Sequence, residues 1–128
     1  MSDGSEFLSD DRGKPMSCIA SRLVDILGSR LCAVIGDVEQ TSIVRAWIDG
    51  VEPTVGRARI LRFALRVAET IEERYGRAAA QSWIQGANHA LADKAPALVL
   101  KRASRVGEAK ALSAERNIAQ ALRKFLDV

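Results

Sequence analysis

The sequence predicts an all-α fold, a helical bundle built around a hydrophobic core. Its 128 residues are enough for one domain, or for two very small ones that must share a core. Hydrophobic residues make up 48% of the chain and charged residues 27%, which is the balance of an ordinary globular domain and argues against a disordered or fibrous protein. Only 5% of the residues are aromatic, and the bulk of the remainder favours helix or sits in helix cores.

Residues 1–16 are expected to be a flexible N-terminal segment, because they are polar and lack helical periodicity. The run Gly-Ser-Glu-Phe at 4–7 is what two adjoining cloning sites encode, which fits a cloning-derived extension. Folded structure is therefore expected from Ser17 onward.

Two short helices are predicted next, because apolar residues recur at helical spacing and each run stops at a glycine. The first stops at Gly28 and the second at Gly36. Their apolar positions are Ile19, Ala20, Leu23, Val24, Ile26 and Leu27 in the first, and Leu31, Cys32, Val34 and Ile35 in the second.

A third short helix closes at Gly50. Its N-terminus is capped either by Asp37, with Gln40 as the capping-box partner, or by Thr41. Two short helices joined by a tight turn, with a helix on either side, are the layout of a helix-turn-helix DNA-binding unit. The apolar positions of the third helix are Ile43, Val44, Trp47 and Ile48.

The third helix is expected to turn a polar face toward a major groove, with Arg45 as its strongest base or phosphate reader. Glu39 and Asp49 flank the same helix and would repel phosphates, so a plain helical hairpin without a DNA role is the alternative. The arginines after this helix belong to an acid-free block that is either part of the DNA contact or a solvated face. The expected DNA-binding residues are Gln40, Thr41, Ser42, Arg45, Arg57 and Arg59.

A long helix from Val55 to Tyr75 is predicted to lie at the centre, because its apolar positions cover more than one face. A short helix between Gly76 and Gly86, a loop over 87–95, and a helix that Pro96 starts should follow it. The chain then ends in an amphipathic helix with apolar positions at Ala111, Ala114, Ile118, Ala121, Leu122 and Phe125.

The net charge of +3 is concentrated in the C-terminal third. Residues 94–124 contain only two acidic side chains, Glu108 and Glu115. Some of the basic residues in this range either lie solvated at a helix end, near favourable carbonyl dipoles, or form part of a partner contact. The basic residues are Lys94, Lys101, Arg102, Arg105, Lys110, Arg116, Arg123 and Lys124.

The sequence argues against an enzyme, a metal site and a bound cofactor. Cys18 and Cys32 lack any zinc-type spacing and are expected to be buried free thiols, and His89 is the single histidine. Known nucleophile, nucleotide-binding and metalloprotease motifs are absent. No apolar stretch reaches the roughly 20 residues that span a bilayer, so a cytoplasmic protein without a membrane partner is expected.

Two motifs resemble the MbcA/ParS/Xre antitoxin family. The first is Val-Glu-Gln-Thr at 38–41 followed by Val-Arg-Ala-Trp at 44–47 and Gly50. The second is Trp-Ile-Gln-Gly-Ala-Asn-His-Ala-Leu at 83–91 followed by Ala-Pro-Ala-Leu-Val-Leu at 95–100, which is similar to the toxin-binding signature of that family. The resemblance covers residues 17–126. It departs from the family at Asp37, where a turn glycine is common, and at Ala87 and His89, where prolines are common.

The resemblance implies an antitoxin of a type II toxin-antitoxin system. Its partner would be a RES-domain toxin that consumes NAD, and the antitoxin would repress its own operon by binding operator DNA as a homodimer or within a larger assembly. Residues 17–75 would bind DNA, and residues 76–128 would bind the toxin and oligomerise. The alternative is a stand-alone transcriptional regulator without a toxin. The expected toxin-binding residues are Trp83, Asn88, Leu91, Pro96, Lys101, Arg102, Arg123 and Lys124.

Several of these residues also have structural interpretations. Trp47 and Trp83 lie on apolar stripes and are expected to be core anchors rather than direct partner contacts. Asn88 is expected to bond the backbone of its own loop, because a short amide side chain competes well for nearby backbone groups.

Overall fold

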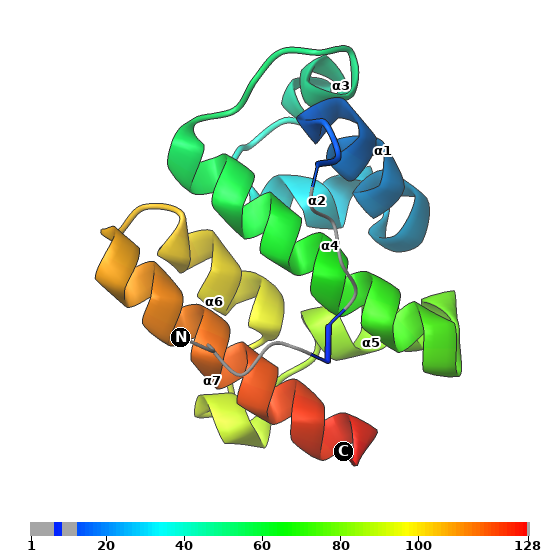
Figure 1. Cartoon of the computed structure of the whole chain (residues 1–128), viewed down its shortest axis with the longest axis vertical. Coiled ribbons are helices and arrows are strands. Elements are labelled where there is room, and N and C mark those ends of the chain that lie inside the picture. Colours follow the sequence, from blue (N-terminus) through cyan, green and yellow to red (C-terminus); the bar gives the residue numbers. More distant parts are fainter. Residues whose placement is uncertain (1–6, 9–12, 128) are drawn as a thin grey trace.

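The structure, a computed structural model, describes residues 7–8 and 13–127. Over these residues the chain forms α-helices and one 3₁₀ turn and no strand, so the predicted all-α bundle is confirmed (Figure 1). The helices are α1 (Met16–Leu27), α2 (Ser29–Ile35), α3 (Thr41–Ile48), α4 (Val55–Tyr75), α5 (Arg77–Gln85), α6 (Pro96–Ala103) and α7 (Glu108–Leu126), with the 3₁₀ turn η1 (His89–Leu91) between α5 and α6.

The long helix α4 runs through the middle of the molecule, as its apolar pattern predicts (Figure 1). It packs against α1, α2, α5, α6 and α7. Its buried residues include Ile60, Phe63, Leu65 and Ala68, whose positions on the helix face several directions. In Figure 1, α3 lies at the top of the molecule and α6 and α7 at the lower left, with α4 between them.

One continuous apolar cluster forms the core. It joins Leu23 of α1, Trp47 of α3, Leu65 of α4 and Leu122 of α7. The two predicted regions, residues 17–75 and 76–128, therefore share a core rather than folding as separate units.

The N-terminal residues that the structure describes are part of this core. Leu8 is only 7% exposed, and Phe7 packs against the cluster. Met16 is buried as the first residue of α1, so the helix starts one residue before the expected position. These residues correct the prediction of a flexible segment at 7–8 and at 16, while its positions 1–6 and 9–12 lie outside the described residues.

The predicted helix stops are confirmed. Gly28 and Gly76 adopt φ values of 89° and 92°, which side chains other than glycine rarely adopt. Each of them ends one helix and begins the next, so the chain changes direction within a single residue.

The predicted cap of α3 is wrong. Gln40 is the N-cap, with extended backbone and no hydrogen bond from its side chain to the helix, and Thr41 is the first helical residue. Asp37 lies outside the helix at φ 59°, and its carboxylate contacts a different part of the chain.

Cys18 also differs from its prediction, since it is exposed, whereas Cys32 is buried as expected. Burial raises the pKa of the Cys32 thiol to about 12, which keeps it protonated and unreactive. Over the described ranges, none of the helices is both long and apolar enough to cross a membrane. No group of three potential metal-ligating side chains comes together in that part of the chain.

Candidate functional site

The turn between α2 and α3 is held by a close approach of Trp47 to Gly36. A Cβ atom added at Gly36 would lie 2.6 Å from the Cη2 atom of the Trp47 ring. The indole is 3% exposed and therefore fills the space that a side chain at Gly36 would need. The φ angle of Gly36 is −79°, which any residue can adopt. The requirement for glycine at this position therefore comes from packing and not from the backbone conformation.

Asp37 stabilises the same turn through two arginines. Its carboxylate accepts hydrogen bonds from Nε and Nη2 of Arg105, the latter at 2.7 Å. The Arg57 guanidinium donates to the carbonyl oxygens of Gly36, at 2.8 Å, and of Asp37, at 3.3 Å. The contact with Arg105 lowers the pKa of the Asp37 carboxyl, with smaller contributions from Lys101 and Arg57. Asp37 adopts the left-handed backbone conformation, at φ 59°, which residues other than glycine and asparagine or aspartate seldom adopt.

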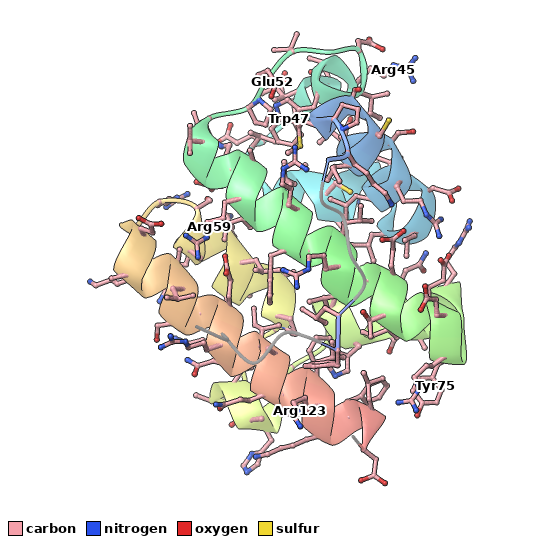
Figure 2. The ribbon with its side chains drawn as sticks, viewed as in Figure 1. Arg45, Trp47, Glu52, Arg59, Tyr75 and Arg123 are labelled. Atoms are coloured by element: carbon pink, nitrogen blue, oxygen red, sulfur yellow. The ribbon has the colours of Figure 1, made fainter. Side chains whose placement is uncertain are left out.

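The polar face of α3 is exposed, as its sequence predicts. Val44 and Trp47 are buried against the bundle, whereas Thr41, Ser42 and Arg45 face solvent. Figure 2 shows Arg45 at the outer edge of α3, pointing away from the other helices. The Arg45 side chain is 73% exposed, and its Nε lies 3.5 Å from a carboxylate oxygen of Asp49.

The exposed face of α3 also includes Gln40 and Ile43. Ser42 donates a hydrogen bond to the Gln40 side chain at 3.2 Å, so these two expected DNA-binding residues lie together at the start of α3. Ile43, expected among the apolar contacts of the helix, is 39% exposed. The exposed face of α3 thus carries Gln40, Thr41, Ser42 and Arg45, together with the apolar Ile43.

The other two expected DNA-binding residues, Arg57 and Arg59, have partners within the protein. Arg57 bonds the α2–α3 turn, as described above. Arg59 lies between α4 and α7 (Figure 2), and its guanidinium donates to both carboxylate oxygens of Glu115 at 2.8 and 3.1 Å. A third bond, at 3.3 Å, reaches Glu108. The structure therefore separates these two arginines from the exposed face of α3 and assigns them structural contacts.

The second motif folds into a compact corner between α5 and α6. The Asn88 side chain accepts a hydrogen bond from the backbone N–H of Ala90 at 3.0 Å, which confirms its predicted role within its own loop. The Asn88 backbone pairs with Lys94 and closes the loop at its neck. Leu91 is 8% exposed, and Pro96 is buried at the first position of α6.

Trp83 of α5 packs near the C-terminal end of α7, in an aromatic cluster that the sequence did not reveal. Its ring centroid is 6.0 Å from that of Phe125, and Tyr75 meets Phe125 edge-on at 5.4 Å. Tyr75 is 53% exposed, so the cluster reaches the surface. Arg123 lies nearby over the Phe7 ring at 5.7 Å from its centroid.

A groove of about 630 Å³ lies between α6 and α7. None of the described residues that line it is acidic. Its walls combine basic and aliphatic side chains: Lys94, Lys101, Arg102, Arg105 and Lys110 are basic, and Leu98, Val99, Ala103, Val106 and Ala114 are aliphatic. We refer to this site as the α6–α7 groove.

The structure divides the four basic residues of the expected toxin-binding set between two places. Lys101 and Arg102 line the α6–α7 groove, whereas Arg123 and Lys124 are exposed near the C-terminal end of α7. With a rise of about 1.5 Å per residue, the backbone of Lys110 lies about 20 Å along α7 from that of Arg123. One small ligand could not contact both sets.

Comparisons with family models, with curated proteins and with solved structures found no match to this chain.

Proposed function

We propose that this protein is the cytoplasmic antitoxin of a type II toxin-antitoxin system. It binds and neutralises a RES-domain toxin that consumes NAD, and it represses its own operon by binding DNA as a homodimer or within a larger assembly. The two motifs at 38–50 and 83–100 support the proposal by their resemblance to the MbcA/ParS/Xre family. The observation that carries it is the presence of two exposed polar surfaces on different parts of the molecule: the face of α3, and the basic side chains of α6 and α7.

The DNA-binding half of the proposal rests on α3. Its buried residues attach one side of the helix to the bundle, which leaves the opposite side free to enter a major groove. Arg45 is the exposed cation on that side, and Asp49 beside it limits attraction to phosphates. A dimer would compensate for weak binding by each subunit, because two recognition helices can contact two half-sites.

The toxin-binding half rests on exposed cations without acidic partners. Arg102, Arg123 and Lys124 make no ion pair with any described residue. In this proposal Asn88, Leu91 and Pro96 act indirectly, because their contacts shape the corner that positions α6. Trp83 supports the C-terminal end of α7 through Phe125.

The toxin half is tested by co-expressing the full chain with the reading frame beside its gene. We expect a complex that survives affinity purification and a cellular NAD level restored to that of cells without toxin. The double variant Arg123→Glu, Lys124→Glu should lose rescue, whereas the exposed Arg116→Glu on the same helix should retain it. Failure of the unaltered chain to form the complex or to restore NAD would contradict the antitoxin proposal and favour the stand-alone regulator.

The DNA half is tested by fluorescence anisotropy with the operon's own promoter fragment at fixed salt. Arg45→Ala should weaken binding about tenfold, because one base or phosphate contact is lost from each subunit. Lys124→Ala, far from α3 along the chain and also exposed, is the matched control. Equal affinity of the Arg45 variant and the control would exclude α3 as the recognition helix.

A further inference from the structure

We propose that the α6–α7 groove is a docking site for an acidic amphipathic helix of a partner protein. The inference deepens the proposed function, because it rests on a protein partner and specifies the chemistry of the segment that this partner presents. Three features of the groove carry it: exposed aliphatic side chains, cations without ion-pair partners among the described residues, and the lack of an aromatic ring among the described lining residues.

The aliphatic part of the groove lining is open to water. Leu98 is 52% exposed and Val106 is 40% exposed, and both line the groove beside Val99. Large aliphatic side chains gathered in a concave site are a feature of interaction surfaces, because their burial by a partner is favourable. An occupant must therefore bring apolar side chains of its own.

Most of the cations that line the groove have no ion-pair partner among the described residues. Arg105 is engaged by Asp37, but Lys94, Lys101, Arg102 and Lys110 form no ion pair with any residue that the structure describes. Cations gathered at one site without ion-pair partners favour an anionic occupant. Carboxylates supply that charge in a protein partner, and phosphates supply it in a nucleic acid.

The lining residues favour the protein. Nucleic acids that enter a groove as single strands stack their bases on aromatic side chains, and none of the described lining residues is aromatic. A phosphate backbone would also leave Leu98 and Val106 exposed to water. A helix with acidic residues on its flanks and leucine-like residues between them complements both the basic and the aliphatic lining residues, as in other helix-in-groove complexes.

The test uses the full chain and fluorescently labelled synthetic peptides. The acidic probe is an amphipathic helix of about 15 residues, about 22 Å long, with Glu on one face and Leu on the other. The matched probe replaces each Glu with Lys, and a single-stranded oligonucleotide of similar length tests the nucleic-acid alternative. Binding is measured by anisotropy at two salt concentrations.

We expect the acidic peptide to bind at least tenfold more tightly than the basic one. The double variant Arg102→Glu, Lys110→Glu should abolish that preference, and Leu98→Ser should weaken binding about fivefold at both salt concentrations. These side chains are exposed, so circular dichroism should show an unchanged fold. Arg116→Glu, on the same helix but outside the groove, should bind like the unaltered chain.

Equal binding of the two peptides would overturn the proposal, as would tighter binding of the oligonucleotide or an unchanged affinity for Leu98→Ser. Failure of the proposed function is distinguishable, because it is measured by toxin rescue and by promoter binding. A chain that binds the acidic peptide through the groove without restoring NAD would retain this inference and lose the toxin.

Discussion

At the scale of single residues, Asp37 has two roles that are separable by experiment. Its backbone adopts φ 59°, and its carboxylate is bound by Arg105 of the α6–α7 connection. Asparagine adopts the same backbone region readily but carries no charge. Replacing Asp37 with asparagine therefore removes the ion pair with Arg105 while preserving the shape of the turn.

Asp37→Asn should lower the free energy of unfolding at neutral pH. Because Arg105 lowers the pKa of the folded carboxyl, the stabilisation is fully present above the unfolded pKa of about 3.9. It is lost as the pH falls through the lower folded pKa. The stability difference between Asp37→Asn and the unaltered chain, measured by urea unfolding, should be constant from pH 7 to about pH 5 and should vanish in stronger acid.

Asp93→Asn is the matched control for this prediction. Asp93 also lies in the left-handed region, at φ 64°, and no arginine of the described chain pairs with its exposed carboxylate. The control should show little difference at any of these pH values. A difference for Asp37→Asn that stays constant into strong acid would contradict the assigned role of Arg105.

Gly36→Ala should destabilise the protein by about 1–3 kcal/mol, because the new methyl group meets the Trp47 ring and forces it to move. Gly107→Ala introduces the same group where no heavy atom lies within 4 Å and φ is −67°. It should change stability by no more than about 0.5 kcal/mol. Thermal or urea unfolding measures both variants. Similar values for the two would show that Trp47 does not require glycine at position 36.

At the scale of elements, an ion pair connects α4 to α7. Glu115 is only 6% exposed, and both of its carboxylate oxygens accept hydrogen bonds from Arg59. The side chain of Arg59 is 33% exposed, so water can solvate it in part if Glu115 is removed. The loss of this partner should therefore cost less than the loss of one member of a fully buried pair.

Glu115→Ala is expected to destabilise the fold by about 2 kcal/mol, because Arg59 would lose its two shortest hydrogen bonds. Arg116→Ala, the adjacent exposed residue of α7, should change the free energy of unfolding by no more than about 0.5 kcal/mol. Urea unfolding compares the two. If Glu115→Ala were as stable as Arg116→Ala, the connection between α4 and α7 would depend on apolar packing alone.

At the scale of the whole molecule, the shared core makes the two proposed functions depend on one fold. Ile118 and Leu122 of α7 are fully buried in the same cluster as Leu23 of α1. Deleting α7 would expose this apolar surface together with Arg59. A shortened chain is therefore unsuited to separating DNA binding from toxin binding, and point variants of exposed residues are required.

A chain that ends at Ser104 should lose cooperative thermal unfolding, because it lacks the α7 part of the core. Circular dichroism and calorimetry of the shortened and full-length chains measure this directly. The full-length chain should unfold in a single transition. A shortened chain with the same Tm, or a full-length chain that unfolds in two separate steps, would show that the halves are independent.

Most of the fold could be predicted from the sequence, because the residues that start and stop each helix act locally. Gly28, Gly76 and Pro96 act through their own backbone conformation, and the apolar spacing of 55–75 indicates a buried central helix without reference to any other segment. The predictions that were wrong concern the cap of α3, the exposure of Cys18 and the packing of Leu8. Each of these features depends on how segments distant in sequence pack against one another.

The sequence by itself determined the all-α class, the order of the helices, their glycine stops, and the basic excess of 94–124. Only the tertiary structure decided which cations are neutralised. Arg57, Arg59 and Arg105 look like any other basic residue in the sequence, yet their partners lie 21, 56 and 68 residues away. Helix limits follow from backbone preferences within a few residues, whereas ion pairing requires two distant segments to meet. That meeting leaves Lys101, Arg102 and Lys110 free to contact a partner.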